Sequence, residues 1–184
     1  LNKFNRKTEE FTVYKNNPDN PNSISSNNII TLYIDKNGTL WAGTLNGLNK
    51  YNKEKDNFSV IKKVSDRLNP DSLNSVVCIE EDHKGNLWLG TWNGLTCMTK
   101  DGKVIKQIFA QPPNYKNFDY RIISSLLIDN KNLWIGLSNK GIAKYDLSSD
   151  KIKFYKSAKN NPSTLSDDHV NIIFKDKENN IWVG

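Results

Sequence analysis

The sequence has few of the residues that build metal sites, disulfide frameworks or nucleic-acid contacts. Of its 184 residues only two are cysteine and two are histidine, whereas a structural zinc site uses about four such ligands and stapled secreted domains carry four or more cysteines. Only three of its 26 basic residues are arginine, and the lysines are scattered among 20 acidic residues. A nucleic-acid footprint would cluster basic side chains, so we predict no metal, no cofactor and no nucleic-acid partner.

Long apolar runs are also missing. No stretch approaches the roughly 20 apolar residues of a membrane-spanning helix, and residues 1–10 lack the apolar core of a secretory signal. No window of useful length has apolar residues at helical spacing, which disfavours α/β folds and helical solenoids. With 36% hydrophobic and 25% charged residues, the composition is that of a globular domain.

Both ends of the sequence suggest a piece of a longer protein. The first residue is Leu1 rather than Met, and residues 181–184 (Ile-Trp-Val-Gly) have the pattern of the middle of a strand. We therefore expect any membrane anchor to lie in parts of the parent protein outside this chain.

Four of the five tryptophans recur at nearly equal spacing, and an aspartate precedes each of them. The spacings are 47, 46 and 48 residues. The first two copies share the string Asp-x-x-Gly-x-Leu-Trp-x-Gly-Thr, the third is one residue shorter, and the fourth has Asn in place of the turn Gly. The repeated positions are Trp41, Trp88, Trp134 and Trp182, with Asp35, Asp82, Asp129 and Asp176.

Each repeat is predicted to form four short strands. In the first complete unit they are expected at Ile29–Ile34, Leu40–Thr44, Leu48–Tyr51 and Phe58–Lys62. Asn46-Gly47 is expected to supply a two-residue hairpin turn in which both residues have positive φ, and 27 asparagines favour many such turns. Four-stranded units of about 40 to 50 residues have the length of a propeller blade. The predicted fold is all-β, a β-propeller of four-stranded blades.

The repeat divides the chain into about four blades of a larger ring. Leu1–Phe4 matches Leu48–Tyr51, so the chain begins with the third strand of a unit, and two, twelve and two strands add up to sixteen. An open half-ring exposes strand edges, so we expect either a larger ring or a homodimer. The expected parts are the end of a blade with its connector (1–28), three blades (29–75, 76–121 and 122–169) and the start of a blade (170–184).

The repeated tryptophans and aspartates are predicted to be structural. A large ring fills the gap that twisted sheets leave when they stack radially, and a turn aspartate caps its own backbone. A catalytic carboxylate pair would need two acids about 5 to 10 Å apart in one cleft, and the aspartates are expected on the face opposite the ligand-binding mouth. Glu80 and Glu81 stand at the end of a first strand, where other copies have Tyr33-Ile34 and Leu127-Ile128. We expect these acids either to face the central channel or to lie at an exposed strand end.

Candidate ligand contacts come from residues that break the repeat. In a propeller, the turns between second and third strands and the connectors between blades surround the mouth of the funnel, where ligands bind. Trp92 lies in such a turn where the other copies have Leu45 and Ser138, and the connector 111–121 is rich in aromatic residues. Aromatic faces stack on sugars and arginine donates hydrogen bonds, although these side chains could instead cap the blades or contact a neighbouring domain. The candidates are Trp92, Tyr115, Tyr120, Arg121 and His169.

The repeat resembles a known family. The string Asp-x-x-Gly-x-Leu-Trp-x-Gly-Thr-x-x-Gly-Leu, preceded by Asn-Pro-x-Ser-Leu-Ser, is similar to the two-component regulator propeller repeat over essentially the whole chain. The resemblance implies a periplasmic sensor region of a hybrid two-component histidine kinase, the ectodomain of an inner-membrane protein. Similar sensors of Bacteroidetes detect oligosaccharides, which implies an oligosaccharide ligand and control of carbohydrate-use genes. The lost turn glycines and the insertion before the third copy depart from strict symmetry.

Without the family resemblance, the repeated four-stranded units alone predict a scaffold that binds a ligand or a partner protein. The resemblance makes this a ligand-sensing segment without enzymatic activity of its own, in a parent that carries histidine kinase activity elsewhere. The alternatives are a secreted propeller enzyme, either a polysaccharide lyase or a glycosidase, and a protein-interaction scaffold. The sequence has no Gly-x-Ser-x-Gly elbow and no phosphate loop, so we predict no catalytic residues.

Overall fold

The computed structural model describes residues 1–61, 75–108 and 122–184 of the chain. In these ranges regular structure consists of short β-strands, and no helix is long and apolar enough to cross a membrane. In chain order the strands are β1 (Asn2–Asn5), β2 (Glu10–Val13), β3 (Ile29–Ile34), β4 (Leu40–Thr44), β5 (Gly47–Asn52), β6 (Asn57–Ile61), β7 (Val76–Glu81), β8 (Leu87–Thr91), β9 (Gly94–Met98), β10 (Val104–Ile108), β11 (Ile123–Asp129), β12 (Asn132–Leu137), β13 (Gly141–Asp146), β14 (Ile152–Tyr155), β15 (Ile173–Lys175) and β16 (Ile181–Val183).

The strands form antiparallel sheets in which sequential strands are neighbours. Three sheets have four strands each: blade 1 (β3 to β6), blade 2 (β7 to β10) and blade 3 (β11 to β14). A first half-blade (β1 and β2) and a last half-blade (β15 and β16) have two strands each. The predicted all-β architecture of four-stranded blades is confirmed.

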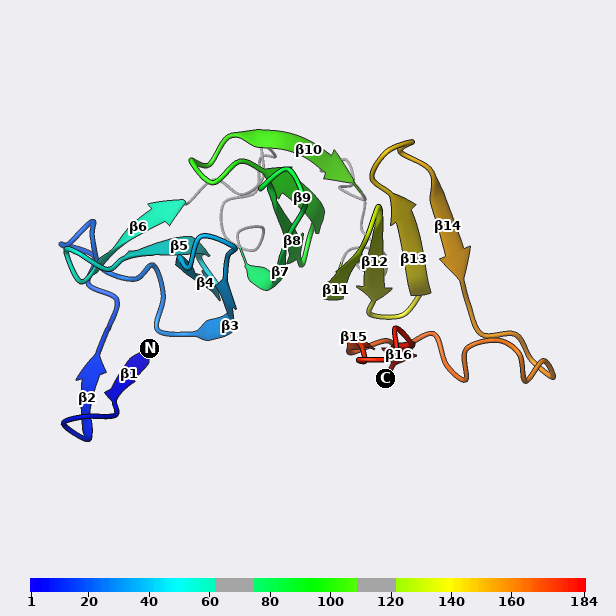
Figure 1. The fold of residues 1–184 in the computed structure, drawn as a ribbon, viewed down its shortest axis with the longest axis horizontal. Coiled ribbons are helices and arrows are strands. Elements are labelled where there is room, and N and C mark those ends of the chain that lie inside the picture. Colours follow the sequence, from blue (N-terminus) through cyan, green and yellow to red (C-terminus); the bar gives the residue numbers. More distant parts are fainter. Residues whose placement is uncertain (62–74, 109–121) are drawn as a thin grey trace.

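The blades stand side by side in an open arc (Figure 1). The first strands β3, β7 and β11 lie on the inner side of the arc, and the fourth strands β6, β10 and β14 lie on its outer side. Inner strands of successive blades contact each other, β3 with β7, β7 with β11, and β11 with β15. The two chain ends lie at the two ends of the arc.

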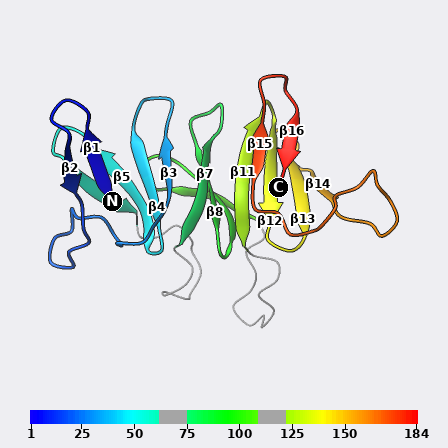
Figure 2. The same ribbon diagram turned by 90° about the horizontal axis from the view of Figure 1, so that it is seen from below.

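The arc has two different faces. The turns that join first to second strands project to the same side in Figure 2, and we call this side the hairpin face. On the opposite side, the turn after β4 lies against the connector that precedes β3, and the turn after β12 lies against the connector that follows β14. We call this side the connector face. Leu45 N donates to Asn28 O at 3.3 Å, and Gly141 N donates to Asp168 O at 2.8 Å.

Each first strand begins irregularly. The register between first and second strands shifts at Ile29/Thr31, Val76/Cys78 and Ile123/Ser125. In the last half-blade, Ile172 N and Asn171 N both donate to Gly184 O, and β15 begins only at Ile173. The first strand of the last half-blade is therefore short, because the irregular pairing with Gly184 occupies its start.

The hairpin turns of the connector face differ from the expected geometry. Gly47 and Gly94 have φ of 109° and 110°, whereas Asn46 and Asn93 are not in the positive-φ region. The prediction of positive φ at both Asn and Gly was therefore wrong. Thr44 pairs with Gly47 across the hairpin, so the turn residues are Leu45 and Asn46, and the glycine is the first paired residue of β5. In blade 2 the corresponding turn residues are Trp92 and Asn93.

Tryptophans join each blade to the next. Trp41 of blade 1 is fully buried in one cluster with Ile79, Leu87 and Met98 of blade 2. Trp88 of blade 2 is likewise buried in a cluster with residues of blade 3. The core is thus a series of contacts between neighbouring blades rather than a single centre, as in repeat proteins.

The turn aspartates hold these tryptophans in place. Asp35 Oδ1 accepts hydrogen bonds from the backbone N–H groups of Asn37 and Thr39, and its Oδ2 accepts one from Trp41 Nε1 at 3.0 Å. The same indole contact links Asp82 to Trp88 at 3.1 Å and Asp176 to Trp182 at 2.7 Å. One carboxylate therefore caps the turn and orients the ring that packs on the next blade.

The shortened third copy has lost this arrangement. Trp134 Nε1 is buried and has no hydrogen-bond partner among the described residues. The turn is two residues long, Asn130 takes a φ of 55°, and Asp129 instead pairs with Lys175 Nζ of the last half-blade at 2.7 Å. Deleting one turn residue thus exchanges a hydrogen bond within the blade for an ion pair between blades.

Candidate functional site

The connector face of blade 2 displays Trp92 on a rigid turn. Its neighbours Thr91 and Asn93 are buried, and Thr91 Oγ1 accepts from Asn93 N at 3.0 Å and donates to Gly94 O at 2.9 Å. The side chain of Trp92 itself is 44% exposed. A large ring on a fixed turn loses little conformational freedom on binding, which suits a stacking platform for a ligand.

A buried polar network fixes the connector face of blade 1. Asn49 is fully buried, and its side chain donates to Ser25 Oγ at 2.8 Å and to Ala42 O at 3.1 Å. The Asn49 Oδ1 atom accepts from Ser25 N at 2.8 Å. Ser25 Oγ also lies 2.9 Å from Thr44 Oγ1 in the hairpin turn. The network thus hydrogen-bonds the end of the connector that precedes β3 to the turn between β4 and β5.

Replacing Asn49 by alanine is expected to destabilise the contact between this connector and the β4–β5 hairpin. The backbone N–H of Ser25 and the carbonyl of Ala42 would lose buried partners, and such groups cost about 1–3 kcal/mol each when unsatisfied. We expect the free energy of unfolding, measured by urea denaturation, to fall by about 2 kcal/mol. The exposed neighbour Asn46 is the control, since its side chain makes only a 3.5 Å contact to Ser25 O. Equal losses in the two variants would contradict the role of the network.

His169 lies on the connector face of blade 3. Its Nδ1 is 2.9 Å from Ser138 O and 3.1 Å from Asn139 Oδ1. Both neighbours are acceptors, so this geometry favours the tautomer with the proton on Nδ1. The side chain is exposed, and Nε2 is then an acceptor that a ligand hydroxyl can approach.

Two of the five candidate residues are described by the structure. Trp92 and His169 belong to neighbouring blades, lie on the same face and make no hydrogen bond to each other. Tyr115, Tyr120 and Arg121 lie outside the described residues.

Two acidic residues at the mouth were not singled out from the sequence. Asp167 Oδ1 accepts from His169 N at 2.6 Å, and Asp168 Oδ1 accepts from Ser157 N at 2.6 Å. The signal that could have found them is the run Asp-Asp-His at the end of a connector. Asp168 holds the connector against blade 3, and Asp167 holds the backbone that carries His169.

The connector after β14 curls around an open hollow of about 630 Å³. Its lining comes from the loop itself and includes Lys159, Asn161 and Thr164. Thr164 Oγ1 donates to Asn161 O at 2.9 Å and accepts from Ala158 N at 3.0 Å, which keeps the loop in shape. The hollow is polar and open to solvent, so it suits a hydrophilic ligand better than an apolar one.

The two unusual acids of β7 lie away from this mouth. Glu81 is 5% exposed, and Lys100 Nζ bridges it to Asp35 of blade 1 at distances of 2.8 and 2.9 Å. The alternatives of a channel acid and an exposed strand end are therefore both wrong for Glu81. Burial raises the pKa of Glu80 to about 7. Among the described residues, no group of three or more His, Cys, Asp or Glu side chains could hold a metal ion.

A comparison with protein families gives one match. The sequence profile described as two component regulator propeller matches residues 23–46, 71–93 and 164–184. Each matched segment spans the end of a connector and the first two strands of a unit. No curated protein sequence matches the chain significantly.

Solved structures are similar over the entire chain. The extracellular domain assigned to the hybrid two-component system BT4673 of B. thetaiotaomicron is 25% identical over 100% of this chain, with a TM-score of 0.83. The extracellular domain assigned to the hybrid system BT3049 of the same organism is 23% identical with a TM-score of 0.52. The chain spans only 23% and 29% of the lengths of these two relatives, so it corresponds to about a quarter of such a propeller domain.

Proposed function

We propose that this chain, three segments of which match the two-component regulator propeller profile, is a ligand-sensing segment of the periplasmic region of a hybrid two-component sensor histidine kinase. The similarity of the whole chain to the extracellular domain assigned to the BT4673 system carries this proposal. In such a sensor the chain itself has no catalytic role. Ligand binding at the mouth, or between propellers, shifts the relative placement of two subunits because the ligand favours one arrangement.

We further propose that the ligand is an oligosaccharide and that the sensor controls carbohydrate-use genes. The support on the described part of the connector face is an exposed indole at Trp92, an acceptor at His169 and the polar connector hollow. Aromatic faces cover the C–H faces of sugar rings, while imidazole and amide groups pair with hydroxyls. Tyr115, Tyr120 and Arg121 belong to the same proposed site.

Replacing Trp92 by alanine is expected to weaken oligosaccharide binding without changing stability. The ring is exposed on a turn whose fold depends on Thr91 and Gly94. Losing one stacked ring removes roughly 1–2 kcal/mol of binding free energy, which corresponds to about tenfold in Kd. A glycan array followed by calorimetry on this chain and on the variant measures the effect.

The conservative variant Trp92→Phe is the matched control, because it keeps an aromatic face on the same turn. It should recover most of the affinity, and both variants should melt like the wild type. A Trp92→Ala variant with unchanged affinity for a captured glycan would remove Trp92 from the ligand site. If no glycan binds while a partner protein is retained, the chain is an interaction scaffold rather than a sugar sensor.

Sequencing the coding DNA on both sides of this stretch tests the sensor assignment itself. We expect further repeats, a membrane helix and a histidine kinase domain. A stop codon without a membrane anchor would overturn the assignment and favour a secreted enzyme, which would then release soluble sugar products from a polysaccharide.

A further inference from the structure

A small cavity lies between blades 2 and 3, beside the β7–β8 turn of the hairpin face. Its volume is about 130 Å³, and its lining comes from the β7–β8 turn, β8, β9, β10, β13 and the turn after β13. Trp88 and Tyr145 both line it, with their ring centroids 5.6 Å apart. We call it the inter-blade cavity. Both blades that enclose it have all four strands, so it belongs to a complete junction within this chain.

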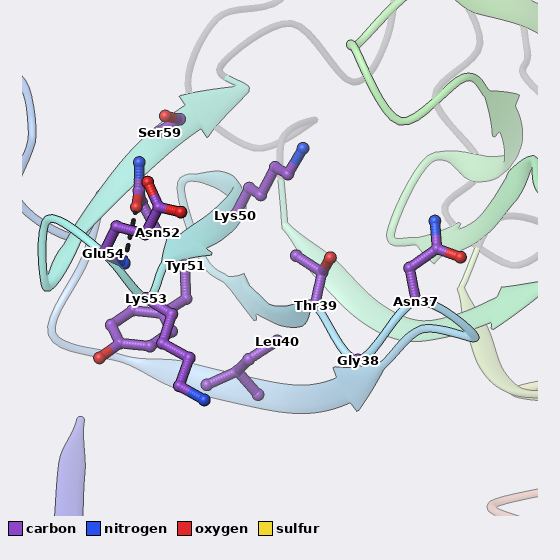
Figure 3. Close-up of a pocket in the computed structure, with 10 residues that line it drawn as sticks. All are labelled: Asn37, Gly38, Thr39, Leu40, Lys50, Tyr51, Asn52, Lys53, Glu54 and Ser59. Carbon is purple, nitrogen blue, oxygen red and sulfur yellow. Dashed lines mark hydrogen bonds between the residues drawn. The ribbon is translucent and has the colours of Figure 1, made fainter.

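In blades 1 and 3, a lysine covers the tryptophan of the second strand. Lys50 lies opposite Trp41 in the β4–β5 pairing, and its Nζ is 5.6 Å from the ring centroid. Figure 3 shows the Lys50 side chain extended from β5. Lys144 lies opposite Trp134 in the same way, with its Nζ at 5.2 Å. In blade 2 the residue opposite the tryptophan is Cys97, which is shorter and lines the inter-blade cavity.

A second lysine is replaced at the same junction. Between blades 1 and 2, Lys100 Nζ lies 2.9 Å from Asp35 Oδ2. Between blades 2 and 3, Leu147 stands at the position of Lys100, and Asp82 stands at the position of Asp35. Leu147 also lines the inter-blade cavity. The cavity therefore lies where the preceding junction holds two lysine side chains.

Asp82 provides a buried negative charge in this cavity. It is 5% exposed and belongs to the cavity lining. Burial raises the pKa of Asp82, but hydrogen bonds from Asn86, Trp88 and the turn backbone outweigh it and hold the pKa below its ordinary value. In the part of the chain that the structure describes, Asp82 forms no ion pair with a lysine or an arginine. Buried charges in proteins are normally paired, so the cavity favours a cation.

The rim of the inter-blade cavity carries charges of both signs. His83, Lys84 and Asp150 are exposed there. Lys106 Nζ lies 2.6 Å from Asp150 Oδ1 and 3.0 Å from the hydroxyl of Tyr145. Lys106 is therefore held at the rim by these partners. The rim lysines oppose the entry of a cation, but solvent screens exposed charges more strongly than the buried carboxylate inside.

We propose that the inter-blade cavity binds a primary alkylammonium group, whose nitrogen lies between the carboxylate of Asp82 and the ring of Trp88. The nitrogen then has the surroundings that lysine ammonium groups have between blades 1 and 2. The side chain of Asn86, which donates to Asp82 Oδ2 at 3.2 Å, gives up this contact to the ammonium. An ammonium interacts more strongly with a carboxylate than a neutral amide does, and a cation over an indole face adds further attraction.

The size of the cavity limits the ligand. A dry cavity of about 150 Å³ holds one benzene molecule, so the volume of about 130 Å³ admits n-butylammonium, the analogue of the lysine side chain, but no oligosaccharide. The cavity also lies at the hairpin face, whereas the proposed sugar site lies on the connector face. An amine site here is therefore independent of the proposed function and adds a second class of ligand.

Titration of the ¹⁵N-labelled chain with n-butylammonium chloride tests the proposal. We expect the indole N–H signal of Trp88 to shift and to saturate, with a dissociation constant on the order of 1 mM for so small a ligand. n-Butanol has a similar shape without the charge and should bind at least about tenfold more weakly. Sodium chloride at equal concentration controls for ionic strength. The indole signal of Trp92, on the connector face, is the internal control and should not move.

Two variants that restore the missing lysines should close the cavity. Cys97→Lys places a lysine opposite Trp88, as in blades 1 and 3, and Leu147→Lys places one at the position of Lys100. Each should weaken n-butylammonium binding at least about tenfold, because the ammonium is then supplied by the chain itself. Thr8→Lys adds the same charge on an exposed turn of the first half-blade and should bind like the wild type. Circular dichroism melts show whether each variant is folded.

Nα-acetyllysine methylamide carries the same ammonium on a peptide backbone and distinguishes two sources of the group. Binding as tight as that of n-butylammonium includes lysine side chains of a partner protein among the ligands, and exclusion restricts the ligand to a free amine. The absence of a saturable shift at Trp88, equal binding of n-butanol, or unchanged binding in both lysine variants of the cavity would overturn the proposal.

Discussion

Replacing Gly43 by alanine is expected to lower the free energy of unfolding by about 3 kcal/mol, the upper end of the usual cost of overpacking. An added Cβ would lie 2.7 Å from the backbone oxygen of Val76 in blade 2 and 2.6 Å from Thr31 Cγ2. The carbonyl belongs to an inner strand and cannot rotate away as a side chain can. Thermal melting followed by circular dichroism should show the midpoint falling by about 6–12 °C for a chain of this size.

Gly38 is the matched control, since it lies in the same repeat and has no atom within 4 Å of an added Cβ. Its φ of 80° makes alanine unfavourable by about 1–2 kcal/mol. Gly136 gives an intermediate case, because its nearest neighbour would be the rotatable Ser124 Oγ at 2.9 Å. If Gly43→Ala and Gly38→Ala melt at the same temperature, close approach of blades at the Trp-x-Gly position is not what requires glycine.

The fold could be predicted because its signal repeats. A period near 47 residues repeats the turn, the indole and the glycine in the same order, and each turn, such as the one from Asp35 to Trp41, is local in sequence. The position of a bulge was harder to predict, because the shift at Ile172 depends on Gly184 across the hairpin. The geometry of Asn46-Gly47 was misjudged for a similar reason, since the hydroxyl of Thr44 and not the Asn-Gly pair sets the turn.

The candidate site could be predicted only in part, because its residues do not repeat. Trp92 could be identified from the sequence because the equivalent positions in the other repeats are Leu45 and Ser138. The roles of Asp167 and Asp168 depend on backbone groups that the fold brings to them. The burial of Glu81 with Lys100 and Asp35 could not be predicted from the sequence. Asp35 lies on blade 1 and Lys100 on the turn after β9, and these three residues have no characteristic spacing in the sequence.

Successive blades meet through different polar contacts on the hairpin face. Between blades 1 and 2 the contact is the buried set of Asp35, Glu81 and Lys100. Between blades 2 and 3, Leu147 stands at the position of Lys100 and lines a cavity of about 130 Å³, while Asn86 Nδ2 donates to Asp82 Oδ2 in place of a lysine. The repeated residues therefore determine the architecture of the blades, whereas individual residues that do not repeat determine the stability of each contact between neighbouring blades.

Replacing Lys100 by methionine is expected to lower the free energy of unfolding by about 3 kcal/mol at pH 7. The side chains of Asp35 and Glu81 are 0% and 2% exposed, and Lys100 Nζ is the cation that contacts both. Breaking a buried ion pair by removing one partner leaves an uncompensated charge, which costs about 3–5 kcal/mol. Urea denaturation at fixed pH measures the loss, and the change should appear as a lower midpoint with an unchanged slope.

The loss should shrink as the pH falls. Burial raises the pKa of Asp35, but the hydrogen bonds from Lys100, Trp41 and the turn backbone outweigh it and hold the pKa below its ordinary value. A depressed carboxyl pKa stabilises the fold above the unfolded-state value of about 4, and this contribution fades below it. The variant lacks the part of that contribution that comes from Lys100, so the difference between the two proteins should begin to shrink below about pH 5 and keep shrinking until the pH falls below the depressed pKa of Asp35. The control Lys106→Met removes a pair whose side chains are 37% and 63% exposed, and exposed pairs contribute little. A gap between Lys100→Met and wild type that is independent of pH would show that Lys100 acts through packing of its methylene chain and not through its charge.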